Sequence, residues 1–197
     1  VGILVIRTPI LLLFNYNLPE ILELLLPISI ITSFTTLLII KSQNKGIFKS
    51  IDNKINFYFF LICLPAIFFG LLLLNLFNHM INFKVFVALI ILLSLVVKYF
   101  FNKKLKKAHK NIKKILMFTI GMIHGLTNSG GTILSLFFSN TNKSTINLAR
   151  LNITYFYLLL AFFQFIIFLF FFKTKINLEK FFLFLIVALT GSFLGNI

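Results

Sequence analysis

The sequence predicts an all-α integral membrane protein with about seven membrane segments, and three observations support this fold class. The 197-residue chain is 59% hydrophobic, has a mean hydropathy of +1.03 and is only 12% charged. Its apolar residues form runs of about 20, the length that an α-helix needs to cross the hydrocarbon core. Lysines gather in the short segments between these runs, as they do in loops that flank spanning helices.

Each expected segment is a run of apolar residues bounded by polar ones. The first run is short and contains Arg7, the last ends with the chain, and the fifth is interrupted by glycines. In chain order the segments cover 2–14, 21–40, 55–76, 85–101, 115–138, 151–172 and 181–197.

The lysines predict the orientation of the chain. The segments 41–54, 103–114 and 173–180 carry four, seven and three lysines, so we expect them on the cytoplasmic side. If every apolar run crosses the membrane once, 139–150 lies outside, together with 15–20 and 75–82. The net charge of +15 then reflects loops beside a lipid bilayer rather than nucleic acid binding.

The interrupted run 115–138 is the most informative stretch, because residues 125–131 read GLTNSGG. Each glycine costs a helix roughly 1 kcal/mol relative to alanine, so we expect the helix to break within 126–131. A backbone opened inside the membrane must be satisfied by protein or by a water-lined cavity. Half-helix N-termini at such a break can hold a substrate. The alternative is that the small residues only allow close packing against a neighbouring helix.

The chain also contains a weak internal repeat. Residues 8–14, TPILLLF, resemble residues 131–137, GTILSLF, and Gly70 matches Gly195 at nearly the same offset. The repeat predicts two tandem units, residues 1–114 and 115–197.

Four helices in each unit would make the two units parallel, related by an axis along the membrane normal. The second unit begins well before its glycine break, whereas Val1 aligns with residue 123 or 124. We therefore expect the first unit to lack its N-terminal part and the second its C-terminal part, so that the chain is truncated at both ends.

The candidate substrate-binding residues lie at the two predicted breaks. The glycine N–H groups could point at an anion, and the short polar side chains could donate hydrogen bonds. A cation inside an apolar run costs roughly 2.5–3.5 kcal/mol, so Arg7 should face a cavity, an anion or the interface. His124 lies one turn before the break and either relays protons or is hydrogen-bonded within the bundle. The candidates are Arg7, Thr8, Thr127, Asn128, Ser129, Gly130 and Gly131.

Enzymatic sites find little support in the sequence. A serine protease within the membrane needs a histidine on another helix, but no histidine follows His124. Asp52, the only aspartate, lies in a lysine-rich segment, and Cys63 is the only cysteine. No Walker-type phosphate loop occurs. We therefore expect no enzyme, no metal site and no cofactor.

The stretch GMIHGLTNSGGTIL at 121–134, with RTPILLL at 7–13, resembles the sulfite exporter TauE/SafE-like family of membrane transporters. The resemblance implies a secondary transporter of small anions, sulfur-containing or organic, and a multi-pass location in a bacterial cell (inner) membrane. A non-transporting membrane assembly or scaffold subunit remains the alternative, and formation of a homo-oligomer stays open.

Overall fold

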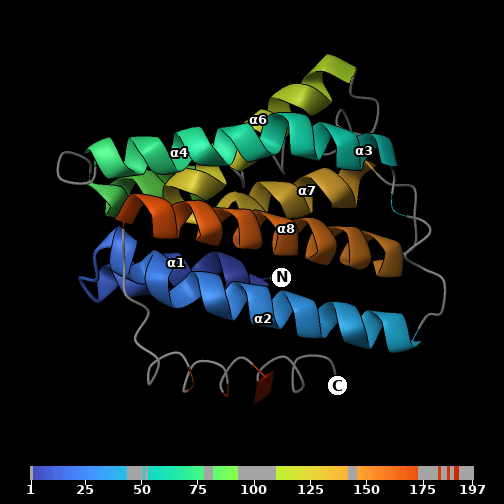
Figure 1. Ribbon diagram of the computed structural model, residues 1–197, viewed down its shortest axis with the longest axis horizontal. Helices are drawn as coiled ribbons and strands as arrows, with labels where there is room; N and C mark the ends of the chain where they lie inside the picture. Colours follow the sequence, from blue (N-terminus) through green and yellow to red (C-terminus); the bar gives the residue numbers. More distant parts are fainter. Residues whose placement is uncertain are drawn as a thin grey trace.

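The computed structural model describes residues 2–43, 51, 53–77, 82–92, 110–141 and 146–172, with four single positions beyond them (Figure 1). Every regular element in this part of the chain is a helix. Three stretches are long and apolar enough to cross a membrane: Leu18–Gln43, Ile55–Phe77 and Asn147–Phe172. The predicted all-α membrane fold is therefore confirmed.

The first two helices form a hairpin. Helix α1 (Gly2–Leu13) contains Pro9 and is followed by Asn15, whose φ of 65° turns the chain back. Helix α2 (Leu18–Gln43) starts where the Asn17 N–H donates to the Glu20 carboxylate at 2.9 Å. This bond satisfies a backbone donor that has no partner within the helix.

The third long helix contains an irregular turn. Helix α3 (Asn53–Tyr58) passes through the π-helical turn η2 (Phe59–Cys63) into α4 (Leu64–Phe77) without a break. The Leu64 N–H donates to the Phe59 carbonyl, the wider spacing of a π-turn. Pro65 follows directly and has no N–H to continue the regular ladder. A short helix, Phe83–Leu92, comes next. The other residues of the predicted segment 85–101 lie outside the described part.

The fifth segment does not cross the membrane once. Helix α6 (Lys110–Thr127) and helix α7 (Gly130–Thr141) meet at a sharp turn. A Cβ added at Gly130 would lie 2.6 Å from the carbonyl oxygen of Ile120, ten residues earlier, so α7 folds back along α6. The expected break within 126–131 is confirmed, but the expected single crossing is wrong, because the chain enters and returns on the same side.

Helix α8 (Ile146–Phe172) runs antiparallel to α2. Leu37 and Ile40 near the end of α2 pack against Leu151 near the start of α8, and Ser29 pairs with Tyr157 further along. The molecule thus has two ends. We call the end that holds Gln43, Asn53, Lys110, Thr141 and Ile146 the basic end (right in Figure 1).

The opposite end holds the α1–α2 turn and the end of α4. There Lys84 Nζ donates to Asn15 Oδ1 at 2.6 Å. The described helix ends Gln43, Asn53 and Lys110 lie together at the basic end, while most of the segments 41–54 and 103–114 lies outside the described part. The expected alternation fails after α7: Thr141 lies at the basic end and Phe172 at the opposite one. Residues 173–180 themselves lie outside the described part.

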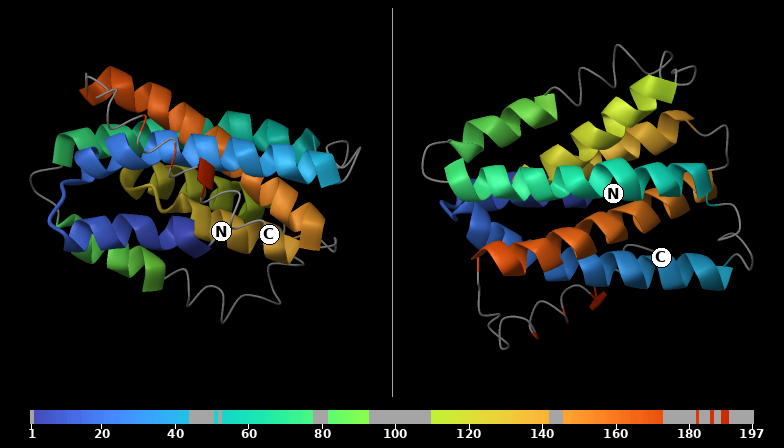
Figure 2. Two further views of the ribbon diagram at one scale, coloured as in Figure 1. Left: turned by 90° about the horizontal axis from the view of Figure 1, so that it is seen from below. Right: turned by 45° about the horizontal axis from the view of Figure 1, so that its top comes forward.

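These directions change the geometry expected for the repeat. Helix α1 runs away from the basic end and α7 runs toward it, while α2 and α8 are antiparallel (Figures 1 and 2). Corresponding helices of the two predicted units thus point in opposite directions, so the expected parallel arrangement is wrong. The duplication itself stays a prediction, and Gly195 lies outside the described part.

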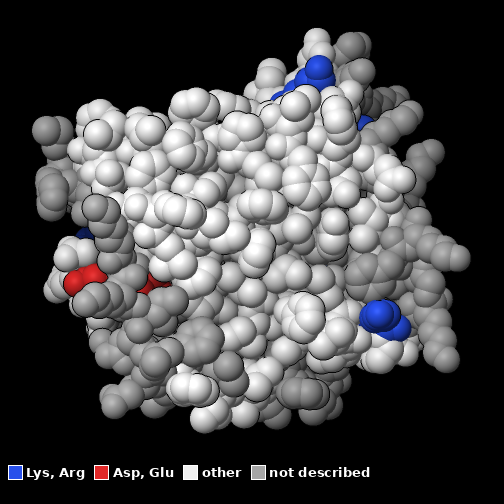
Figure 3. Space-filling model, in the orientation of Figure 1, with Lys and Arg blue, Asp and Glu red and all other residues white. Residues whose placement is uncertain are grey.

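The core is made by close backbone contact and aromatic packing. A Cβ at Gly70 of α4 would lie 3.0 Å from the Cα of Gly125, and one at Gly121 would meet the Cys63 carbonyl, so α4 and α6 pack backbone to backbone. The ring centroid of Phe156 on α8 lies 5.0 Å from the ring centroids of both Phe59 and Phe138. The described charges on the visible face lie at its two ends, with an uncharged band between them (Figure 3).

Candidate functional site

The candidate site is built around the turn between α6 and α7. Asn128 has a φ of 57°, a conformation that asparagine adopts more readily than most residues. Its N–H donates to the His124 carbonyl at 2.8 Å and closes the last turn of α6. The Thr127 hydroxyl donates back to the Ile123 carbonyl at 2.9 Å. The chain therefore reverses within two residues and keeps its backbone groups satisfied on the α6 side.

The α7 side of the turn is capped differently. The Ser129 N–H donates to Thr127 Oγ1 and the Ser129 hydroxyl donates to the Thr127 carbonyl, both at 3.3 Å. The serine hydroxyl therefore donates back into the turn. A serine that caps a helix would instead accept a hydrogen bond from an N–H group in the first turn of α7. The first N–H groups of a helix have no intrahelical partner and carry its positive dipole end. The Thr132 N–H of this first turn donates to the Ser129 carbonyl at 3.2 Å, so the N–H groups of Gly130 and Gly131 are the ones left to face a negative charge at this dipole end.

Helix α8 holds the hairpin from the other side. Gln164 Nε2 donates to the carbonyls of His124 at 2.8 Å and Gly125 at 3.4 Å, so a side chain satisfies the C-terminal carbonyls of α6. The Tyr157 ring lies 5.6 Å from the His124 ring, nearly edge to face. The Tyr157 hydroxyl lies 3.4 Å from Ser29 Oγ on α2. Helices α2, α6 and α8 therefore meet at this tyrosine.

Five of the six buried side-chain atoms that lack a hydrogen-bond partner among the described residues belong to the elements of this site. They are Thr8 Oγ1, Asn128 Oδ1, Gln164 Oε1 and both ring nitrogens of His124. His124 is 0% exposed, Thr8 1% and Asn128 2%. An unpaired buried polar atom costs about 1–3 kcal/mol, and such atoms are rare. These unpaired atoms make the surroundings of the turn the candidate site among the described residues.

The sequence candidates are brought together only in part. Thr127 to Gly131 form the turn, and Thr8 is carried by α1, which packs against α7 and α2. Arg7 belongs to α1, but its side chain lies outside the described part. A Cβ at Gly131 would lie 2.6 Å from the Tyr157 ring, and one at Gly130 would meet His124. The two glycines thus make room for the protein's own atoms.

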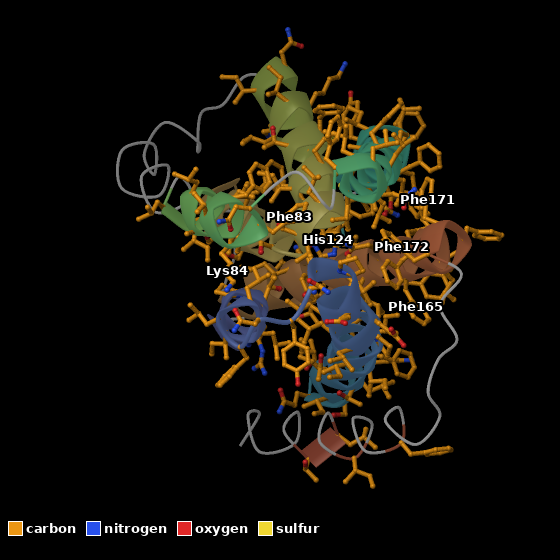
Figure 4. The ribbon with its side chains drawn as sticks, turned by 90° about the vertical axis from the view of Figure 1, so that its left-hand side faces the viewer. Phe83, Lys84, His124, Phe165, Phe171 and Phe172 are labelled. Atoms are coloured by element: carbon orange, nitrogen blue, oxygen red, sulfur yellow. The ribbon has the colours of Figure 1, made fainter. Side chains whose placement is uncertain are left out.

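Three residues of the site were not among the candidates: Ser29, Tyr157 and Gln164. Gln164 carried a signal, because an amide within the apolar run of 151–172 has to find a partner. Tyr157 carried none, since tyrosine is common in apolar runs. Figure 4 shows His124 in the middle of the bundle, viewed from the end opposite the basic one.

The fold and the site define a class of protein: a helical membrane transporter with a helical hairpin that turns back inside the bundle. The family follows from comparison with known proteins. The chain belongs to the sulfite exporter TauE/SafE family, whose model matches residues 1–197. No curated protein and no solved structure matches it.

Proposed function

We propose that this transporter moves small anions, sulfur-containing or organic, and that the anion binds at the turn between α6 and α7. The observation that carries the proposal is the coincidence of two features. The N-terminus of α7 lies in the bundle interior, and buried polar atoms without partners belong to the helices that meet there. Helix N-termini bind sulfate, phosphate and carboxylate through backbone N–H groups and the helix dipole.

Each unpartnered group has a use in such a site. The Thr8 hydroxyl can donate to an anion oxygen, and an imidazole nitrogen of His124 can do the same. The Asn128 amide, turned by half a rotation, would present its NH₂ group. The backbone N–H groups of Gly130 and Gly131 would add two more donors. This chemistry fits a compact oxyanion such as a sulfite or a sulfonate.

The directions of the helices suggest how the site would open. Opposed directions of α1 and α7, and of α2 and α8, support an inverted pair of units, an arrangement that permits alternating access around a central site. On the charge pattern we propose that the basic end faces the cytoplasm of a bacterial cell. Transport, rather than catalysis, is the activity in keeping with the family.

A second reading has its own supporting observation. Gly70, Gly121 and Gly125 are accounted for by the contact of α6 with α4 and the adjoining turn η2. Gly130 is accounted for by its contact with α6, and Gly131 by its contact with the Tyr157 ring of α8. A membrane scaffold subunit that binds no substrate would need the same glycines. It would not need buried polar atoms without partners, so we favour the transporter.

The test is counterflow in liposomes that contain the purified protein. Liposomes preloaded with sulfite, sulfoacetate or a related sulfonate should accumulate the labelled form of the same anion, and chloride-loaded ones should not. The variant Asn128→Gly, which removes the amide but tolerates the φ of 57°, should need up to about tenfold more anion to reach half of its maximal rate. Ser139→Ala, an exposed change at the end of α7, is the matched control. Absence of counterflow with every anion of the panel would favour the scaffold.

A further inference from the structure

His124 is the only titratable side chain of the turn and its surroundings are unusual. It is fully buried, both ring nitrogens lack a hydrogen-bond partner among the described residues, and its one ring contact is with Tyr157. A histidine kept for packing or structure normally donates one N–H to a carbonyl or carboxylate. His124 makes no such bond to a described residue, so one ring nitrogen is available to a proton and the other to a ligand.

The described elements that pack against α6 supply no negative charge to this ring. Helices α4, α7, α8 and the turn η2 contain no Asp or Glu, and neither does α6 itself. Their titratable groups are Cys63 on η2, Tyr155, Tyr157 and Arg150 on α8, and Lys110, Lys113 and Lys114 on α6. Helix α2, which reaches the site at Ser29, carries Glu20 and Glu23 nine and six residues earlier, about 13 and 9 Å along the helix. The side chain of Arg7, on α1, lies outside the described part.

Distance removes most of these groups from consideration. Lys114, the nearest α6 lysine, precedes His124 by ten residues, about 15 Å along a helix. Arg150 lies near the start of α8, at the basic end. Cys63 is a buried thiol of η2, and its carbonyl faces Gly121, one turn before His124 on α6. Of the described titratable groups, only the neutral tyrosine Tyr157 contacts the imidazole.

The electrostatics of an occupied site then differ from those of an empty one. Without an anion, an imidazolium at this position would be an unpaired buried charge, which costs several kcal/mol. An anion in the site adds at least one full negative charge. The N-terminal end of the α7 dipole supplies only about half of a positive charge to balance it. A proton on His124 balances the charge of a monoanion and halves that of a dianion.

We propose that His124 takes up one proton when the anion binds, so that this transporter carries a proton together with each anion. The inference rests on the proposed function and adds its coupling ion. The proton comes from the aqueous phase on the side from which the anion enters and leaves with it on the other side. The anion is not altered.

The test counts protons directly by calorimetric titration of the purified protein. The heat of binding is measured in buffers with different ionisation enthalpies, and its slope gives the protons taken up per anion. The probes are methanesulfonate and sulfoacetate, because both stay fully ionised at neutral pH whereas sulfite itself gains a proton. We expect about one proton to be taken up per anion at neutral pH. Over the pH range in which binding takes up this proton, the anion affinity should fall about tenfold for each unit by which the pH rises.

Variants assign the proton to a residue. His124→Gln should take up less than about a fifth of a proton per anion and bind at least tenfold more weakly. His109→Gln, a histidine in the lysine-rich segment 103–114, should match the parent protein. His124→Asn serves if the glutamine variant does not fold, and Tyr157→Phe should keep the proton.

Binding without proton uptake in the parent protein would overturn the inference and leave the proposed function standing. So would an unchanged proton count in His124→Gln or His124→Asn. Failure of both probes and of sulfite to bind the parent protein would instead refute the proposed function, and the coupling with it.

Discussion

The pair α1–α2 and the pair α7–α8 have the same outline and different chemistry. In each, a short helix turns into a long one, and the two long helices lie antiparallel in the centre of the molecule. The first short helix carries Thr8 before Pro9, where the second has two glycines. Only the second is preceded, in the described part, by a helix that brings a histidine to the turn.

The comparison shows how a duplicated unit can divide one task. The tight turn of α6 and α7 needs glycine because ring and backbone atoms occupy the space, whereas α1 has room for a threonine side chain. At the proposed site, the α7 side would contribute backbone donors and an imidazole, and the α1 side a hydroxyl.

The prediction with the largest expected effect concerns the side of the membrane that each helix end faces. Its failure would show that the two helix pairs are not inverted. Single cysteines at the exposed positions Ser42, Ile112 and Ser139 should react with an impermeant thiol reagent from one side of the membrane. A cysteine at Phe14, 72% exposed, should react only from the other side. Cys63 is buried and should give little background. If Ile112→Cys and Ser139→Cys react from opposite sides, the hairpin does not return and the units are not inverted.

Exchange of matched residues should give the next largest effect. Gly131→Thr places the residue of the first unit into the second, where its Cβ would meet the Tyr157 ring. Overpacking of this kind costs about 1–3 kcal/mol or more, so the variant should lose most of its folded yield. Thr8→Gly should cost only about 1 kcal/mol. Thermal unfolding in detergent measures both, and equal losses would show that the two positions do not differ.

Asn128 allows the backbone and the side chain to be separated. Asn128→Ala should lower the free energy of unfolding by about 1–2 kcal/mol, because alanine is disfavoured at a φ of 57°. Asn128→Gly should keep the stability and still weaken anion binding, by about tenfold or less, through the lost amide. If both variants bind as the parent protein does, the amide does not contact the anion.

The smallest effect comes from Thr8, whose hydroxyl has no partner among the described residues. Thr8→Val keeps the shape and removes an unpaired buried hydroxyl, so stability should be unchanged or rise by up to about 1 kcal/mol. Anion affinity should fall several-fold, because the valine has no hydroxyl to donate. A loss of stability without a loss of affinity would assign Thr8 to the fold alone.

Sequence patterns located the helices and the break, because apolar runs and glycine clusters are local signals. The reversal at Asn128 and Ser129 was not predictable in this way. A broken helix that continues and one that turns back have the same composition, and only contacts such as Gly130 with Ile120 distinguish them.

The same limit explains why the topology was predicted wrongly and why residues of α8 were not proposed for the site. One wrong crossing at α6–α7 inverted the expected direction of α8, although the lysine counts fitted the expected alternation. Thr127 to Gly131 could be proposed together from the sequence because they share one stretch of chain. Tyr157 and Gln164 reach the turn from α8, which lies next to it only after folding.

The central claim, an anion at the turn between α6 and α7, is tested most directly by substrate protection. Ser129→Cys in a Cys63→Ala background should react with a thiol reagent during transport. A counterflow anion should slow this reaction with the half-saturation it shows in transport, while Ser135→Cys further along α7 should react at an unchanged rate. If saturating anion leaves the labelling of Ser129→Cys unaltered while transport proceeds, the anion binds elsewhere.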